Sequence, residues 1–415
     1  MSSRSLSSQL PSAYKNIPRS VSPQTAAAQT RLGKIGLNLL YIVPGKVGGT
    51  EIYAHELVRA LALETPQTEF VVFCGSEAKR SLGSAGWPMN VRIVPVNLSS
   101  ALKPLRIVVE LFWLPWLASR ERVELLHSMG TTGPLWSGCV RVLTVHDLIF
   151  HHFPSTFPRL ARIGLELIVP RAARRSQRVH ADSLATKNDL IASYALPAEK
   201  IDVIYLGLGM SQPDEVTTEA ELRARLELGH ASVVLSVSAA LAHKNIDRLL
   251  EAFAKLLARS MPGRQTPVLV LVGHAGREQE NLIARARALG IENAVRFTGW
   301  IESSDLEGLY RLASCFVYPS LFEGFGMPVL EAMQRGTPVA SSNATSLAEV
   351  AGRGAELFDP LDIAAMSSAI ERLLSDEPYR QELIARGHAQ AARFTWQQTA
   401  RETLASYRQA LDDHA

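Results

Sequence analysis

Short apolar runs that alternate with helical patterns constrain the fold more than any other feature of this sequence. The run at 35–43 ends in a Pro-Gly turn, and Ile52, Leu57 and Leu61 then recur at helical spacing. Apolar strands separated by helices are typical of parallel sheets that are covered on both faces. We therefore predict an α/β protein with two doubly wound, Rossmann-like domains. The further strands expected from the pattern are 69–74, 91–96, 124–128 and 140–145, and then 233–237, 268–272, 295–298, 315–318 and 338–340.

A chain of 415 residues is too long for one ordinary core, and the pattern divides it into four parts. Residues 1–30 are rich in Ser, Pro, Ala and Gln without apolar periodicity, which predicts a disordered tail. The first domain is expected at 31–206 and the second at 207–393, with the substrate cleft between them. An amphipathic helix at 394–415 is expected to cross back to the first domain.

Composition argues against several classes of protein and site. The net charge of +3 gives no reason to expect nucleic-acid binding. Cys74, Cys139 and Cys315 are isolated in apolar runs, which predicts reduced core thiols, and no Cys/His cluster has the spacing of metal ligands. Neither a secretory signal nor an apolar stretch of about 18–20 residues is present. We therefore expect a cytoplasmic protein, with peripheral contact at the inner face of the membrane left open.

The segment from Glu323 to Glu331, E-G-F-G-M-P-V-L-E, is the strongest indication of function. It follows the expected strand at 315–318, and Pro328 suits the first turn of a helix that Gly336 ends. The free N–H groups of a helix N-terminus suit a diphosphate, and the carboxylates can accept hydrogen bonds from sugar hydroxyls. One acidic pair alone would indicate a surface residue and a turn, but the full string favours a ligand site.

We expect the loop between these carboxylates to offer the backbone groups of Gly324, Phe325 and Gly326 to a ligand, because glycine lets a ligand approach closely. A second loop, after the strand at 233–237, carries Lys244, whose compact charge suits a departing diphosphate. Asn245 is expected to cap the next helix. A lysine before a helix is usually solvated, but its place at a strand end in the same domain favours a functional role.

Together these segments resemble glycosyltransferase family 4, whose two-Rossmann-domain architecture is called GT-B. The similarity spans nearly all of 34–411. Within the family it is greatest to the bacterial mannosyltransferases that build lipopolysaccharide and exopolysaccharide chains. The motifs that carry the resemblance lie at 48–50, 144–148, 243–245, 319–333, 336–338, 346–352 and 358–360.

The resemblance implies a role for each matching residue. Lys244 would bind the donor diphosphate, Glu323 would lie by the sugar and phosphates, and Glu331 would hold the ribose. Gly49 would supply a backbone amide near the donor phosphate or the acceptor, and His146 would contact the transferred sugar. The catalytic set is then His146, Glu323 and Lys244, in a retaining enzyme without metal or cofactor. GDP-mannose is the first expected donor and a UDP-hexose the second, with a glycan or lipid-linked acceptor.

The chain departs from the family at donor-site positions. Ala239 stands where many members have arginine, and His243 stands where closer bacterial relatives have one. One guanidinium is therefore absent or supplied from elsewhere. Ala348 replaces a common proline, but Ser346 and Glu349 are still expected to form a capping box, which makes Glu349 structural rather than catalytic.

During transfer, charge grows on the leaving phosphate, and Lys244 with backbone N–H groups would stabilise it. The chain has no D-x-D triplet, in keeping with a metal-free site. A carboxylate nucleophile is one route to retention. We favour attack by the acceptor hydroxyl on the leaving-group face. His146 and Asp147 are neighbours on an extended segment and point to opposite sides, so we do not expect them to form a relay.

The apolar and aromatic stretch at 102–117 and the basic cluster of Arg171, Arg174, Arg175 and Arg178 could together rest on an anionic leaflet. The sequence favours the alternative, a buried core helix with solvated arginines.

Other functions remain as alternatives. A nucleotide-sugar epimerase of the same architecture would share the donor site but release a free sugar isomer. A non-catalytic GT-B-like binding subunit is expected to lack Lys244, Glu323 and Glu331, which are present. A dehydrogenase would need the spacing G-x-G-x-x-G, which the glycine turn at 45–49 does not have.

Overall fold

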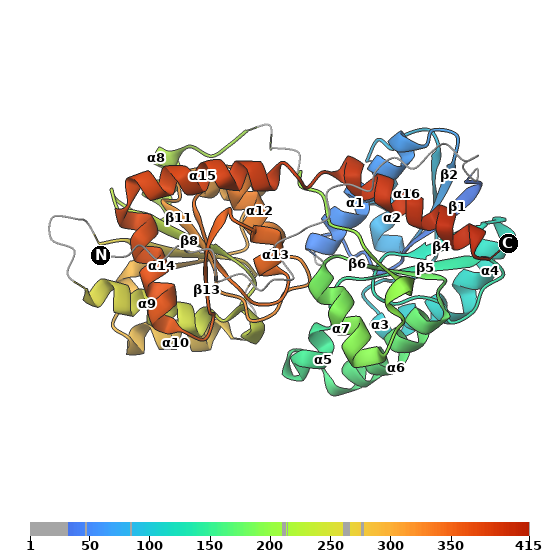
Figure 1. The fold of residues 1–415 in the computed structure, drawn as a ribbon, viewed down its shortest axis with the longest axis horizontal. Coiled ribbons are helices and arrows are strands. Elements are labelled where there is room, and N and C mark those ends of the chain that lie inside the picture. Colours follow the sequence, from blue (N-terminus) through green and yellow to red (C-terminus); the bar gives the residue numbers. More distant parts are fainter. Residues whose placement is uncertain are drawn as a thin grey trace, which may run out of the picture. The chain divides into compact units, whose positions relative to one another are not determined.

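The computed structural model describes residues 32–45, 48–83, 85–209, 213, 215–259, 266–274 and 278–414. The tail predicted at 1–30 lies outside these residues. The described chain forms two α/β domains, each built around one parallel sheet (Figure 1). The predicted fold class is therefore confirmed, whereas the division of the chain at residue 207 stays a prediction.

The first sheet is made, in the described chain, of β1 (Lys34–Leu39), β2 (Glu69–Cys74), β3 (Val91–Pro95), β4 (Leu125–Ser128), β5 (Val140–Val145), β6 (Arg178–Ala181) and β7 (Ile201–Val203). The order of these strands is β3-β2-β1-β4-β5-β6-β7, and every pairing is parallel. The order reverses between β1 and β4, so the loops after these two strands diverge and leave a crevice at their carboxyl ends.

The second sheet contains β8 (Val233–Val237), β9 (Val268–Val272), β10 (Val295–Gly299), β11 (Cys315–Tyr318), β12 (Val339–Ser342) and β13 (Ala355–Phe358). Its order is β10-β9-β8-β11-β12-β13, again with parallel pairings. The reversal here falls between β8 and β11. The loops that follow these two strands are the ones in which the sequence placed Lys244 and Glu323.

Helices cover the sheets (Figure 1). Those that the structure describes in the first domain are α1 (Gly49–Glu64), α2 (Ser76–Gly83), α3 (Lys103–Val108), a π-helical turn η3 (Val109–Trp113), α4 (Leu114–Arg120), α5 (Ile149–His152), η4 (Pro154–Thr156), α6 (Arg159–Arg175), α7 (Leu184–Tyr194) and η5 (Ala198–Lys200). Later in the chain come α8 (Glu219–Arg225), η6 (Ala242–Lys244), α9 (Ile246–Ala258), α10 (Gln279–Ala288), η7 (Glu292–Ala294), α11 (Ser303–Leu312), α12 (Met327–Gln334), α13 (Leu347–Ala351), α14 (Ile363–Ser375), α15 (Glu377–Ala391) and α16 (Trp396–Asp412). None of the described helices combines the length and the apolar character that a bilayer crossing requires.

The strands that the pattern found are apolar runs buried on both faces, such as β2, β8 and β9. It missed β6, β7 and β13. In β6, Arg178 is buried and pairs with Asp202 of β7, and His180 is hydrogen-bonded to Ser406 of α16 at 2.8 Å. A strand whose buried polar residues are hydrogen-bonded to residues far along the chain does not show the apolar run by which a buried strand is recognised in a sequence. Arg178 therefore does not belong to the solvated or membrane-facing cluster in which the sequence placed it.

The interpretation of 102–117 as a buried core helix is wrong for about half of its side chains. Leu114 and Leu117 are buried, but Phe112, Trp113 and Trp116 are exposed. The stretch is also not one helix, because the π-helical turn η3 separates α3 from α4.

Helix α16, near the C-terminal end of the described chain, packs against the first sheet (Figure 1). Tyr407 is fully buried, and its hydroxyl is hydrogen-bonded to Nδ1 of His127 in β4 at 2.6 Å. Ser406 donates to Asp202 of β7 at 2.7 Å. Nε2 of His127 lies 2.7 Å from the Thr144 hydroxyl of β5, so both ring nitrogens are used. Burial lowers the pKa of His127, and the ring is therefore neutral.

We expect Tyr407→Phe to lower the free energy of unfolding by about 1–3 kcal/mol, because it leaves a ring nitrogen of His127 buried without a partner. Calorimetric melting of both proteins measures the loss. Gln409→Ala, an exposed change on the same helix, is the control and should cost less than about 0.5 kcal/mol. Equal melting temperatures for Tyr407→Phe and Gln409→Ala would contradict this role of the hydroxyl.

Candidate active site

Lys244 and Glu323 meet at the point where the second sheet reverses its strand order. Lys244 ends the short helix η6 after β8, and Glu323 lies in the loop after β11. The ammonium donates to Glu323 Oε1 at 2.6 Å and to the Tyr318 hydroxyl at 3.1 Å. Glu323 also fixes the loop through its backbone N–H, which donates to the Thr345 hydroxyl at 3.0 Å. The two charges that the sequence proposed from separate loops thus form one pair at the usual ligand position of such sheets.

Burial and the charge of the partner shift the pKa of each member of this pair in opposite directions. Burial alone would lower the pKa of Lys244, but Glu323 and Tyr318 outweigh it and raise the pKa above its usual value. Burial alone would raise the pKa of Glu323, but the adjacent ammonium outweighs it and lowers the pKa. Both groups are therefore charged at neutral pH.

The glycines of the loop are required by the backbone. A Cβ atom on Gly324 would lie 2.0 Å from the carbonyl oxygen of His146, which belongs to the loop after β5. Gly326 has a φ of 103° at the N-cap of α12, where an L side chain is strained. Phe325 differs from them, because its side chain is buried and its ring packs edge-on against Phe394, with centroids 5.7 Å apart. Any contact of Phe325 with a donor would therefore be made by its backbone atoms.

Glu331 lies one turn into α12 with its carboxylate buried. Tyr310 donates to its Oε2 at 3.0 Å, and Arg335 donates to its backbone carbonyl at 2.9 Å. Burial raises the pKa of Glu331, although Arg335 and Tyr310 oppose the shift. In the part of the chain that the structure describes, no hydrogen bond to the other oxygen, Oε1, is found, so this oxygen can accept one from a ligand hydroxyl.

His146 follows β5 and pairs with Asp182, which follows the neighbouring strand β6. Its Nδ1 lies 2.7 Å from Asp182 Oδ2, and its Nε2 lies 2.9 Å from the backbone carbonyl of Met129. Because both partners are acceptors, the ring donates from both nitrogens and is an imidazolium. Burial opposes this charge, but Asp182 outweighs it and raises the pKa of His146. The sequence missed Asp182, because it missed the strand that positions it.

Asp147 does not take part in this pair. Its Oδ1 accepts from the N–H of Ile149 at 3.0 Å, where it closes a local turn. His146 and Asp147 thus have separate partners, as the expectation against a relay requires.

Further contacts join the loops of the first sheet to those of the second. The Thr186 hydroxyl lies 3.3 Å from the carbonyl oxygens of both His146 and Gly324. A Cβ atom on Gly49 would lie 3.7 Å from Met327, the first residue of α12. The predicted residues Gly49, His146 and Gly324 are therefore gathered at one place.

A cavity of about 360 Å³ opens beside this place. Glu323 forms part of its wall, together with Phe322 and Thr345 from the second domain. The first domain contributes His152, Ala185, Thr186 and Asp189. The catalytic carboxylate that we predicted thus borders a space with polar groups from both domains.

The capping box that the sequence predicts from Ser346 and Glu349 is wrong. Ser346 does not cap α13 with its side chain, because its hydroxyl donates to the carbonyl oxygens of Glu323 and Phe325, at 3.0 and 2.9 Å. Glu349 accepts instead from the backbone N–H groups of Leu184 and Ala185 at the start of α7, at 3.2 and 3.1 Å. Instead of capping α13 together, Ser346 holds the loop that carries Glu323, and Glu349 binds the start of α7.

Asn245 occupies the N-cap position of α9, but its side chain does not cap that helix. The amide donates instead to the carbonyl oxygens of Pro319 and Pro360, at 3.0 and 2.8 Å. Asn245 therefore ties the lysine loop to the strand end that precedes Glu323.

His243 does not replace the missing guanidinium. The ring is buried, and its centroid lies 5.7 Å from that of Phe153. Burial, together with the charge of Lys244, lowers the pKa of His243 to about 4, so it is neutral at neutral pH. Among the described residues, no group of three or more His, Cys, Asp or Glu side chains is arranged to hold a metal ion.

Comparison with known proteins places this geometry in a family. The model described as "Glycosyltransferase Family 4" matches residues 47–211, and "Glycosyl transferases group 1" matches 218–390. O-antigen chain mannosyltransferase B of Escherichia coli is 31% identical over 268 residues, which cover 64% of this chain and 70% of that protein. The chain belongs to glycosyltransferase family 4. Its resemblance to that family is thereby confirmed.

Solved structures agree with the fold of this family 4 glycosyltransferase. Sucrose-phosphate synthase from Thermosynechococcus elongatus has a TM-score of 0.70 at 20% identity, over 92% of this chain and 100% of that one. Anabaena HepE in complex with UDP and glucose has a TM-score of 0.68 at 21% identity, over 91% and 100%. At such identities the likeness shows the GT-B fold alone.

We expect Asp182→Asn to lower the pKa of His146 in this glycosyltransferase, because the carboxylate is what holds the imidazolium in a buried place. A group whose pKa is raised by folding stabilises the protein below its unfolded pKa, about 6.5 for histidine, and loses this effect as the pH rises through the folded value. The destabilisation caused by Asp182→Asn should therefore be largest in mildly acidic solution and shrink above it.

Melting temperatures across this pH range test the expectation, together with the NMR titration of the His146 ring. Asp189→Asn breaks a similar pair with His152 at the surface and is the matched control. A pH-independent loss in Asp182→Asn, with an unchanged titration of His146, would show that the carboxylate does not set the charge of the ring.

Proposed function

We propose that this glycosyltransferase transfers a hexose from a nucleotide diphosphate donor to a glycan or lipid-linked acceptor in surface or exopolysaccharide synthesis. The proposed sugar is mannose from GDP-mannose, and a UDP-hexose is the second candidate. The Lys244–Glu323 pair at the switch point of the second sheet is the observation that carries this proposal. The similarity to a mannosyltransferase over most of that protein's length supports the choice of mannose.

In the proposed donor complex, Lys244 releases part of its contact with Glu323 and meets the diphosphate. The N–H groups at the start of α12, which no side chain caps, add to this stabilisation in the proposed complex. Oε1 of Glu331 accepts a hydrogen bond from the ribose. The negative charge that grows on the leaving phosphate is then held without a metal ion, which we propose as part of the mechanism.

We propose that transfer retains the anomeric configuration by attack on the face that the diphosphate leaves. The bond from the acceptor oxygen to the anomeric carbon forms as the bond from that carbon to phosphate breaks. The acceptor proton passes to a phosphate oxygen. In this route Glu323 stays an ionised carboxylate beside Lys244 and forms no covalent bond to the sugar.

The backbone carbonyl of His146 lies against Gly324, next to Glu323, and the charge of the His146 ring suits a sugar rather than a proton relay. An imidazolium with both N–H groups occupied cannot serve as a base. We therefore propose that His146 and its carbonyl oxygen position the transferred hexose, with the charge of the ring held by Asp182.

The alternatives predict different outcomes. A nucleotide-sugar epimerase would need a group that removes or returns a proton at the sugar, and it would release a free sugar isomer. A non-catalytic subunit would bind the donor without transfer. Product analysis distinguishes all three.

We expect a GDP-sugar to raise the melting temperature more than UDP-, ADP- or dTDP-sugars do, equally with magnesium and with EDTA. Lys244→Met should weaken donor binding by roughly tenfold or more, because it removes a charged hydrogen-bond donor to the diphosphate. Lys255→Met, an exposed change on α9, is the matched control. Each shift is measured against the melting temperature of that variant without donor, because Glu323 loses its partner in Lys244→Met. Absence of stabilisation by every nucleotide sugar would contradict the proposed function.

We expect His146→Ala to lower turnover far more than donor affinity, because the residue positions the sugar and not the nucleotide. Transfer assays with lipid-linked glycans, together with titrations of the donor, separate the two effects. Unchanged turnover would remove His146 from the mechanism. Mass spectrometry of a glycosyl adduct on Glu323 would overturn the same-face route.

A further inference from the structure

The segment 102–120 presents an unusual outer surface to solvent. Phe112 is 63% exposed, Trp113 is 51% exposed and Trp116 is 46% exposed. The rings of Trp113 and Trp116 lie together, with centroids 4.7 Å apart. Leu102, Leu105 and Val108 of the same segment are also exposed. We call these six residues the aromatic face. Several exposed apolar side chains within one short segment are typical of an interaction site.

The side chains on the inner side of the same segment are buried in the protein. Leu114 and Leu117 enter the core. Glu110 is buried in the π-helical turn and accepts from the Thr132 hydroxyl at 2.7 Å, with Arg106 3.5 Å away. Phe112 and Trp113 belong to the π-helical turn and Trp116 belongs to α4, and all three rings are exposed while the segment is anchored. They cannot turn inward without unburying Glu110 or the leucines.

The exposed charges of the segment 102–120 are positive. The charged residues of 102–120 are Lys103, Arg106, Glu110 and Arg120. Glu110 is buried, so no carboxylate of this described segment faces outward. Lys103 and Arg120 are exposed, and the Arg120 guanidinium lies 5.5 Å from the centroid of the Trp116 ring. Aromatic rings with basic neighbours are typical of the polar boundary of an anionic bilayer.

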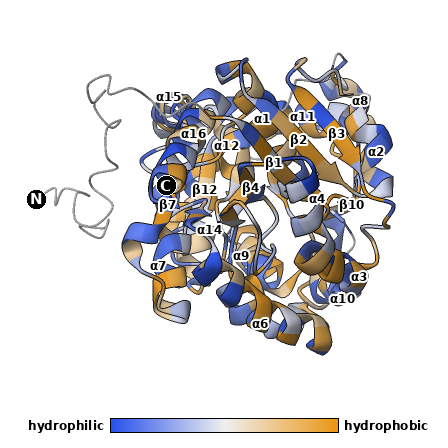
Figure 2. Cartoon of the chain, turned by 90° about the vertical axis from the view of Figure 1, so that its right-hand side faces the viewer, coloured by the Kyte–Doolittle hydropathy of each residue, from blue (hydrophilic) through white to orange (hydrophobic). Residues whose placement is uncertain are grey.

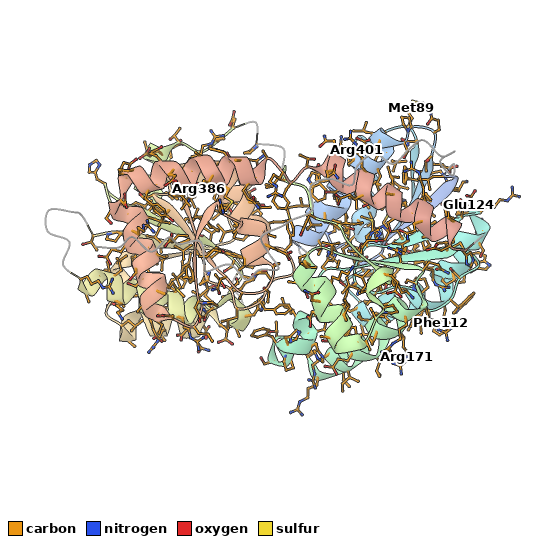
Figure 3. The ribbon with its side chains drawn as sticks, in the orientation of Figure 1. Met89, Phe112, Glu124, Arg171, Arg386 and Arg401 are labelled. Carbon is orange, nitrogen blue, oxygen red and sulfur yellow. The ribbon has the colours of Figure 1, made fainter. Side chains whose placement is uncertain are left out.

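Helix α6 also exposes apolar and basic side chains, together with one ion pair, Arg162–Glu166. Leu160, Ile163 and Leu167 are exposed at spacings of three and four residues, so they form one stripe along the helix. Arg159 and Arg171 are exposed on the same helix. Figures 1 and 2 both draw α3 and α6 in the lower part of the first domain, and Figure 3 labels Phe112 and Arg171 on that side.

We propose that the aromatic face, with the exposed stripe of α6, docks this protein on the surface of an anionic lipid bilayer. The rings enter the boundary between headgroups and acyl chains, and the lysine and arginines contact lipid phosphates. The basic rim favours a lipid surface over a protein partner, for which an exposed apolar patch alone would be enough.

Glu110 connects this face to the candidate active site. Its partner Thr132 lies in the loop after β4, three residues beyond Met129, whose carbonyl oxygen contacts His146. A lipid-linked acceptor held at the docked face would thus lie close to the loops that hold the sugar. Delivery of such an acceptor rests on the proposed function, whereas docking itself does not.

Vesicle sedimentation with the full chain tests the proposal. We expect binding to vesicles of phosphatidylglycerol mixed with phosphatidylcholine, and much weaker binding to pure phosphatidylcholine or at high salt. The combined change Phe112→Ser, Trp113→Ser and Trp116→Ser should weaken the binding by roughly tenfold or more. Quenching of tryptophan fluorescence by brominated lipid should fall with it.

Two controls make the result specific. Leu63→Ser with Leu361→Ser removes side chains of similar exposure elsewhere and should leave vesicle binding unchanged. Lys103→Glu with Arg120→Glu should weaken binding to anionic vesicles while leaving the aromatic residues in place. The shift in melting temperature caused by the donor should be the same in all these variants, which separates failure of docking from failure of the proposed function.

Several outcomes would overturn the proposal. These are no binding to anionic vesicles, equal binding by the serine triple variant, or equal binding to neutral and anionic vesicles. A concentration-dependent increase in mass by light scattering that the serine triple variant abolishes, without vesicle binding, would instead make the aromatic face a contact between copies of this chain.

Discussion

The close approach of two backbone segments at Gly324 sets the geometry of the candidate active site. A hydrogen atom stands there in place of a side chain, and the carbonyl oxygen of His146 takes the room that a Cβ atom would need. Thr186 bridges the carbonyl oxygens of both residues. Because backbone atoms, rather than flexible side chains, make this contact, the loops after β5 and β11 are held in one relation. Glu323 and His146 depend on that relation for their positions.

Charge is distributed around this contact in two buried pairs. Lys244 with Glu323 supplies a cation at the switch point of the second sheet, and His146 with Asp182 supplies another beside the first sheet. In each pair the partner's charge outweighs the cost of burial for the cation. Such pairs contribute little net stability, since desolvation offsets most of the attraction. In the mechanism we propose, what these pairs contribute is preorganisation, because each cation is already held in place before the donor binds.

The first domain carries both the loops of the candidate active site and a surface of exposed aromatic side chains. Glu110 satisfies Thr132 on the inside of a helical segment whose outside carries exposed aromatic rings. Docking, as we propose it, brings an apolar boundary to the domain that carries this polar site. The segment from α3 to α4 combines the two, with Glu110, Leu114 and Leu117 buried on one side and the aromatic rings exposed on the other.

The sequence by itself determined the strands that are apolar on both faces, the two parallel sheets and the loops that carry Lys244 and Glu323. These features depend on local periodicity and on glycines that a turn requires, and both can be read along the chain. Only the tertiary structure decided the partners of buried polar groups, such as Asp182 for His146, Asp202 for Arg178 and the start of α7 for Glu349. Those partners are remote in sequence, and burial without a partner is so costly that the fold, rather than the pattern, selects them. The sequence also assigned the residues of the aromatic face to the core, because their apolar character was evident along the chain but the side of the segment that faces solvent was not.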